Sequence, residues 1–173
     1  MLRPGKRAKR YIAAAAVAVA ATPLLGVGAF ITLDRIYPLP PVGEVPVSAQ
    51  VVDRDGRLLR AFATQEGRWR LPVSLDEVDP QFVKMLIAYE DKRFRDHHGV
   101  DPAAMLRASV QFAVNGRIVS GGSTLTMQLA RLMEVGGGQS ISVKLRQMFR
   151  AVQIERALSK DQILERYLTL APY

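Results

Sequence analysis

Two adjacent carboxylates stand out in the sequence as candidates for acid–base chemistry. Glu90 and Asp91 open a charged stretch that runs to Gly99, and the apolar stripe before them predicts a helix that ends there. The negative end of the helix dipole disfavours a charged carboxylate, which suits a general base. The same stretch also fits a solvated helix end, so these residues alone leave both interpretations open.

A glycine pair followed by hydroxyl side chains forms a second cluster. Gly121 and Gly122 precede Ser123 and Thr124, and Gln128 follows one turn later. Backbone N–H groups at such a helix start form a binding site for phosphate. No Lys follows the glycines at the position that a P-loop requires. Both a phosphate site and an ordinary capped helix start fit the pattern.

A third cluster lies on a long basic helix predicted over residues 142–158. Lys144, Arg146 and Arg150 lie on this helix, together with Gln147. Positions 146 and 150 share a face, as do 147 and 150. Such a face usually only solvates a helix, but it can also hold a pyrophosphate.

Further helices must position these clusters. Asp79-Pro80 and Asp101-Pro102 each supply an N-cap and a proline at the first helical position, and the second of these helices is expected to end near residue 115. A hydroxyl-capped helix is expected from about 124 to 134. Ser159 opens a capping box for a last helix that reaches Leu170.

Before residue 79 the pattern is typical of strands. Residues 49–52 and 58–62 flank a turn at 53–56 and predict a β-hairpin. Residues 69–73 are predicted to add a short third strand. Residues 45–173 are therefore predicted to be mainly α, with a small N-terminal β-hairpin.

Charge is distributed unevenly along the chain of 173 residues, whose formal net charge is +8. Residues 1–10 carry five bases and no acid, and residues 11–33 carry no charge. That run exceeds the roughly 20 residues that cross a bilayer as a helix. The bases place the N-terminus in the cytoplasm. We expect one transmembrane signal anchor over 11–33.

A cleaved signal peptide is the main alternative, because residues 17–21 resemble a cleavage site. The apolar run continues past them to residue 33, which favours an uncleaved anchor. The Pro-rich residues 34–44 predict a stiff spacer, so residues 45–173 are expected outside the membrane.

Composition removes several classes of protein. The chain is 49% hydrophobic and 23% charged, which excludes intrinsic disorder. It has no cysteine, which excludes a disulfide framework, a zinc-thiolate site and a catalytic thiol.

Taken in order, the clusters resemble the peptidoglycan glycosyltransferase domain (glycosyltransferase family 51) of class A penicillin-binding proteins and monofunctional transglycosylases. The first family motif, E-D-x-x-F-x-x-H-x-G, is matched by Glu90, Asp91, Phe94, His97 and Gly99. The second, G-x-S-T-x-x-x-Q, is matched by Gly121, Ser123, Thr124 and Gln128. The fourth, K-x-x-I-L-x-x-Y-L-N, is matched by Lys160, Ile163, Leu164, Tyr167 and Leu168.

The resemblance implies a lysozyme-like fold and polymerisation of lipid II on the periplasmic side of the bacterial inner (cytoplasmic) membrane. Glu90 matches the general base, which deprotonates the acceptor sugar's 4-hydroxyl. That oxygen attacks the anomeric carbon with inversion, and undecaprenyl pyrophosphate leaves. The resemblance also implies further residues of the substrate site, which are Asp91, Phe94, His97, Gly121, Ser123, Thr124, Gln128, Lys144, Gln147 and Arg150. Among them, His97 is expected to be structural.

The sequence departs from the third family motif, R-K-x-x-E. Lys144 is kept, but Gln147 replaces the glutamate that is counted as a second catalytic carboxylate. An amide cannot titrate. We therefore assign the pyrophosphate role to Lys144 and leave the role of Gln147 open. The final Asn of the fourth motif is Thr169 here.

The sequence stops at Tyr173, before the fifth family motif and the transpeptidase domain of class A proteins. We expect a C-terminally incomplete glycosyltransferase domain. The apolar face of the last helix, which includes Ile163, Leu164, Tyr167 and Leu168, is expected to lack part of its cover.

Other functions fit less well. A non-catalytic, membrane-anchored fragment that binds lipid II or cell-wall partners is the main alternative, inactive because it is truncated. A glycoside hydrolase lacks a second placed carboxylate. No nucleic-acid partner is expected, because anionic lipid accounts for the N-terminal bases. The expected partners are lipid II, the growing glycan strand, the bilayer and cell-wall synthesis proteins.

The sequence does not decide whether the chain binds a divalent metal. Mg²⁺ or Mn²⁺ bound to a pyrophosphate is chemically sensible. No acidic spacing in the sequence stands out as a ligand set, so we assign no metal ligand.

Overall fold

The computed structural model describes residues 21–22, 25–40, 47–117, 121–134 and 140–172. The chain divides into two compact units, Met1–Pro40 and Pro41–Tyr173. The division falls inside the predicted spacer 34–44. Residues 25–36 of the first unit are helical.

The predicted membrane span cannot be followed along its whole length. Residues 1–20 and 23–24 lie outside the described part, and with them the basic segment 1–10 and most of the span 11–33. Among the described residues, no helix is both long enough and apolar enough to cross a bilayer. The anchor therefore stays a prediction.

The predicted hairpin is confirmed. Strand β1 (Gln50–Val52) pairs antiparallel with β2 (Leu58–Ala61), with an irregular register between Val51 and Val52. The side chain of Asp53 accepts hydrogen bonds from the backbone N–H groups of Asp55 and Arg57 and so shapes the turn.

The predicted third strand over 69–73 is wrong, because the described part of the chain has a sheet of two strands. Arg70 does approach the hairpin: its carbonyl accepts from Ser48 N at 2.8 Å, and its N–H donates to Ser48 Oγ at 2.9 Å. Pro72 has no N–H with which to continue this pairing. A short helical turn, η1 (Leu75–Glu77), follows instead.

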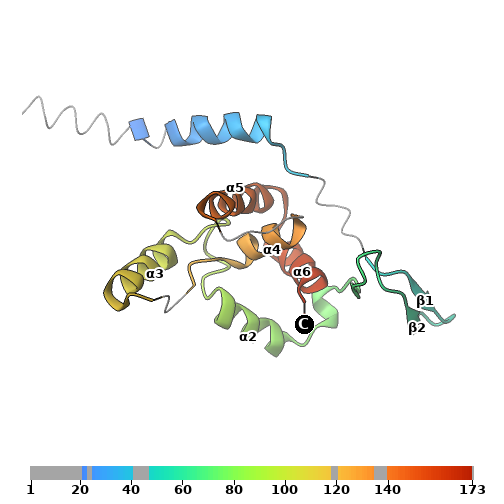
Figure 1. Cartoon of the computed structure of the whole chain (residues 1–173). Helices are drawn as coiled ribbons and strands as arrows, with labels where there is room; N and C mark the ends of the chain where they lie inside the picture. The colour runs from blue at the N-terminus through green and yellow to red at the C-terminus, as the bar shows by residue number, and fades with distance from the viewer. Residues whose placement is uncertain (1–20, 23–24, 41–46, 118–120, 135–139, 173) are drawn as a thin grey trace, which may run out of the picture. The chain divides into compact units, whose positions relative to one another are not determined.

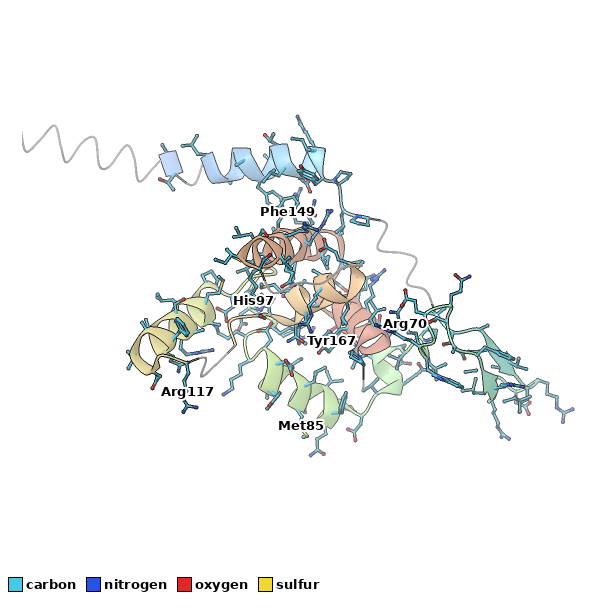
Figure 2. The ribbon with its side chains drawn as sticks, viewed as in Figure 1. Arg70, Met85, His97, Arg117, Phe149 and Tyr167 are labelled. Carbon is cyan, nitrogen blue, oxygen red and sulfur yellow. The ribbon has the colours of Figure 1, made fainter. Side chains whose placement is uncertain are left out.

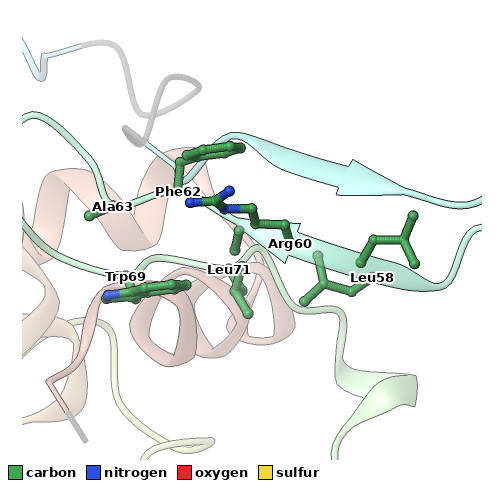
Figure 3. A pocket seen from close by; sticks show the side chains of 8 residues that line it. Leu58, Arg60, Phe62, Ala63, Trp69 and Leu71 are labelled. Atoms are coloured by element: carbon green, nitrogen blue, oxygen red, sulfur yellow. The ribbon is translucent and has the colours of Figure 1, made fainter.

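Beside β2 the hairpin leaves an open groove of about 500 Å³ (Figure 3). It is lined by Leu58, Leu59, Arg60, Ala61, Phe62, Ala63, Trp69 and Leu71. Ala61 is the one buried residue of the two strands, so the hairpin adds little to the hydrophobic core.

Helices make up more than half of the described residues of the second unit, which confirms the mainly α prediction (Figure 1). They are α2 (Pro80–Glu90), α3 (Pro102–Asn115), α4 (Leu125–Met133), α5 (Ile141–Ala157) and α6 (Lys160–Leu170). Each begins at a side-chain N-cap, in order Asp79, Asp101, Thr124, Ser140 and Ser159. The capping box between Ser159 and Gln162 is present as predicted.

The core forms where α4 packs against α5 and α6 (Figure 1). Leu125, Leu129, Ile154, Ile163 and Leu164 are each at most 1% exposed. The expectation that the apolar face of α6 lacks cover is therefore wrong, because α4 covers it. Helices α2 and α3, by contrast, have no fully buried residue.

Candidate functional site

Glu90 is the last residue of α2, as predicted, and Asp91 is its C-cap. The half-buried Glu90 carboxylate faces α4, where Gln128 Nε2 donates a hydrogen bond to its Oε2 at 2.7 Å. The hydroxyl of Tyr167, on α6, donates to Gln128 Oε1 at 3.1 Å. Three helices thus meet at the candidate general base.

Asp91, next to Glu90, is buried in the protein. It is 7% exposed, and its Oδ2 accepts from His97 Nε2 at 2.9 Å and from the backbone N–H of Leu125 at 3.0 Å. Leu125 is the first residue of α4, where a negative charge is favoured by the helix dipole. Asp91 therefore ties the loop after α2 to the start of α4.

Thr124 makes a second tie between the same two segments. Its hydroxyl donates to the carbonyl oxygen of Gly99 at 2.6 Å and accepts from the N–H of Met127 as the N-cap of α4. Thr124 is only 2% exposed. The hydroxyl of Thr124, a predicted substrate-site residue, is thus bonded within the protein, whereas the neighbouring Ser123 is half-buried.

Phe94 anchors the loop between α2 and α3. Its ring is fully buried, and Lys160 Nζ lies 4.5 Å from the ring centre. The same ammonium donates to the carbonyl oxygen of His97 at 2.6 Å and to Glu155 Oε1 at 2.7 Å. Glu155 also accepts from the hydroxyl of Thr126 on α4. The loop is thereby held against α4, α5 and α6.

The second and third clusters meet, as the shared pyrophosphate interpretation requires. Lys144 Nζ, from the first turns of α5, donates to Ser123 Oγ. Burial lowers the pKa of Lys144, and the positive charge of Arg131 lowers it further. Gly121, two residues before Ser123, is exposed. Together Ser123, Lys144 and Arg131 offer a hydroxyl and two cations.

Arg131 was not among the predicted site residues. It lies in the last turn of α4 and influences both Lys144 and Tyr167 by its charge. The sequence contained no spacing signal for it, because its place beside Lys144 depends on how α4 packs on α5.

Two further predicted site residues lie on α5. Gln147 is buried, with 8% of its surface exposed. Arg150 is half-buried and held by two oxygen acceptors, Glu134 Oε1 at 3.3 Å and Gln153 Oε1 at 2.8 Å.

Within the described ranges, no three His, Asp or Glu side chains gather closely enough to hold a metal ion.

Comparison with known proteins decides the family. The family profile described as Transglycosylase matches residues 55–173. The chain belongs to the transglycosylase family. It is 43% identical over 157 residues to penicillin-binding protein 1C of Escherichia coli, an alignment that covers 91% of this chain and 20% of that protein.

Other relatives agree with this assignment to the transglycosylases. Penicillin-binding protein 1A of E. coli is 39% identical over 152 residues, which cover 84% of this chain and 18% of that protein. Penicillin-binding protein 1F of Bacillus subtilis is 37% identical over 121 residues, which cover 70% and 16%. The chain spans about a fifth of the length of these curated relatives. The resemblance to the glycosyltransferase domain of class A penicillin-binding proteins is confirmed.

The candidate site thus holds two chemically distinct groups of side chains. Glu90 with Gln128 offers a hydrogen-bonded carboxylate, and Ser123 with Lys144 and Arg131 offers a hydroxyl and two cations. Transfer of a sugar from a pyrophosphate needs a base for the incoming hydroxyl and cations for the leaving group. The site contains groups of both kinds.

Proposed function

We propose that the chain is a peptidoglycan glycosyltransferase that polymerises lipid II into glycan strands. Glu90 takes the proton from the 4-hydroxyl of the acceptor sugar, and that oxygen attacks the anomeric carbon of the donor. The bond to undecaprenyl pyrophosphate breaks, and the configuration at the anomeric carbon inverts. The observation that carries the proposal is the 2.7 Å hydrogen bond that orients the half-buried Glu90 carboxylate from Gln128.

Lys144 and Ser123 are proposed to receive the pyrophosphate of the donor. Their direct contact places a cation and a hydroxyl together, and Arg131 adds a second cation nearby. Gly121 contributes exposed backbone next to them. Asp91, Phe94, His97 and Thr124 are proposed to support this site from within, because each is buried. The substrate roles of Gln147 and Arg150 stay predictions.

The proposed setting is the outer face of a bacterial cytoplasmic membrane. Residues 11–33 are uncharged and follow five bases, as in a signal anchor with its N-terminus in the cytoplasm. A lipid-linked substrate requires the catalytic unit to stay within reach of the bilayer. The bilayer and cell-wall synthesis proteins are the further partners proposed.

Polymerisation of lipid II by the detergent-solubilised full chain tests the proposal. We expect glycan product that disappears when moenomycin, an inhibitor of this family, is added. Product from the wild type would exclude the alternative of a non-catalytic fragment. Binding of lipid II without any product would support that alternative.

Glu90→Gln tests the assignment of the base within the same assay. Because an amide cannot accept the proton, we expect turnover to fall by about 10²–10⁴-fold while lipid II binding persists. Asp55→Asn, at an exposed position in the turn of the hairpin, also exchanges a carboxylate for an amide and should leave turnover unchanged. Retained turnover in Glu90→Gln would refute the assignment.

A further inference from the structure

Three side chains form a continuous hydrogen-bonded chain from α6 to α2. The Tyr167 hydroxyl donates to Gln128 Oε1 at 3.1 Å, and Gln128 Nε2 donates to Glu90 Oε2 at 2.7 Å. Tyr167 lies within the helical unit at the α6 end of this chain (Figure 2). The resemblance matches Tyr167 to the fourth family motif and assigns its hydroxyl no role.

The direction of these hydrogen bonds follows from the chemistry of the ends. An ionised carboxylate can only accept, so the Gln128 amide must present its NH₂ group to Glu90. The amide oxygen then faces Tyr167, whose hydroxyl must donate. If the amide rotated by half a turn, its oxygen would face the Glu90 oxygen and two acceptors would oppose each other. In the observed orientation the tyrosine hydroxyl gives the amide a second hydrogen bond, which restrains its movement.

Tyr167 is well suited to remain a donor. It is 8% exposed, and burial raises the pKa of its hydroxyl, as does the negative charge of Glu90, although Arg131 partly opposes them. The hydroxyl therefore keeps its proton at neutral pH. Its ring packs in the core regardless of the hydroxyl, which separates a packing role from a hydrogen-bonding role.

We propose that Tyr167 is a positioning residue whose hydroxyl fixes the Gln128 amide and, through it, the Glu90 carboxylate. Where it concerns catalysis, this inference rests on the proposed function. Removing the hydroxyl leaves Glu90 in place but lets the amide sample orientations that no longer support the base. The expected loss is therefore in kcat rather than in substrate binding.

The kinetic test compares the full-length wild type with Tyr167→Phe, which keeps the ring. We expect kcat to fall about tenfold, the value of one ordinary hydrogen bond, with KM within about twofold. The acid limb of the pH profile of kcat should move to higher pH, because the carboxylate has lost support. Tyr89→Phe makes the same chemical change at a side chain that is 88% exposed, and should alter none of these quantities.

A double-mutant cycle asks whether Tyr167 acts through Gln128. In a Gln128→Met background, adding Tyr167→Phe should cost no further activity, because the link is already broken. Gln128→Met alone should lower kcat at least as much as Tyr167→Phe does. If the two substitutions are additive, Tyr167 acts by another route and the proposal is overturned.

A readout that needs no turnover keeps this inference separate from the proposed function. In ¹⁵N-glutamine-labelled chain, the Gln128 side-chain amide, assigned by its loss in Gln128→Met, should give two well-separated proton signals. Tyr167→Phe should bring them together or broaden them, while Tyr89→Phe leaves them unchanged. An unchanged amide in Tyr167→Phe overturns the inference, even if the wild type polymerises lipid II. If the wild type shows no turnover, that result counts against the proposed glycosyltransferase function. The NMR signals of the Gln128 amide would then still test whether Tyr167 holds that amide.

Discussion

Lys144 holds its charge in a place that disfavours it. Burial and the neighbouring charge of Arg131 both lower its pKa, and its ammonium already contacts Ser123 Oγ. A bound dianion would reverse this effect, because it compensates both positive charges. These charges support the proposal that Lys144 receives the pyrophosphate of the donor.

Lys144→Met should weaken binding of the pyrophosphate-bearing donor by about tenfold or more, because one charge-assisted hydrogen bond is lost. In the wild type, affinity should also decline as pH rises through the lowered pKa of the lysine, and this decline should vanish in the variant. Donor affinity measured across pH checks both expectations. Lys84→Met, at an exposed position of α2, serves as the control. Equal affinities of wild type and Lys144→Met would contradict the assignment.

Motif chemistry predicted some of these side chains and could not have predicted others. Glu90, Ser123 and Lys144 were found because residue type and order along the chain sufficed. Arg131 became visible only in the structure, since its place beside Lys144 depends on how α4 faces α5. Charge neighbours that lie on different helices have no fixed spacing in sequence.

The loop between α2 and α3 closes on α5 at Gly99. This residue has φ +91°, and a Cβ there would lie 2.7 Å from both the carbonyl carbon and the oxygen of Ala151. The contact joins the backbone of Gly99 to the backbone of α5, so neither segment can shift without disturbing its own hydrogen bonds. The glycine of the first motif is therefore required by packing, and through it the loop presents Phe94 to the core.

Gly99→Ala should destabilise the chain by more than the roughly 1–3 kcal/mol that the backbone conformation alone costs. The close approach to Ala151 adds to that cost. Gly116→Ala is the matched control, because Gly116 also has a positive φ, +63°, but an added Cβ would meet nothing within 4 Å. Urea unfolding of both variants in detergent measures the difference. Equal losses would show that the contact with α5 does not matter.

Helix starts were predictable because their signals are local. Each N-cap carboxylate or hydroxyl accepts from a backbone N–H group within a few residues, as Asp79 does from Gln81 and Ser159 from Gln162. The third strand failed for the opposite reason, since a strand requires a partner that local sequence does not specify. The prediction that the apolar face of α6 lacks cover is wrong for the same reason. Its cover comes from α4, which begins about 35 residues earlier in the sequence.

Several of the contacts that unite the second unit are between charges. Arg95 meets Asp161 at 2.6 Å across 66 residues of chain, and Lys160 meets Glu155 between α5 and α6. Arg93 pairs with Asp101, the N-cap of α3, with Nε 2.9 Å from Oδ2. The chain already carries a net charge of +8. Protonating carboxylates therefore both breaks these pairs and increases self-repulsion.

Asp101 gives a specific expectation for acid stability. Burial opposes its ionisation, but hydrogen bonds from Arg93 and from the N–H of Ala104 outweigh burial and hold its pKa below the usual value. A carboxyl whose pKa is lowered by folding contributes stability above its unfolded pKa of about 3.9. That contribution is lost as pH falls through the lower value of the folded state.

Asp101→Asn should therefore be less stable than the wild type at pH 7, and the two curves should converge as pH falls below about 4. Asparagine still caps a helix, so the substitution removes the charge and keeps the cap. Asp79→Asn makes the same exchange at the cap of α2, outside this ion pair, and so controls for the loss of a cap charge alone. Urea unfolding between pH 7 and pH 3 measures all three. If Asp101→Asn converges with the wild type no more than Asp79→Asn does, the ion pair with Arg93 does not link the loop to α3 energetically, and the acid sensitivity of the molecule must come from its other carboxylates.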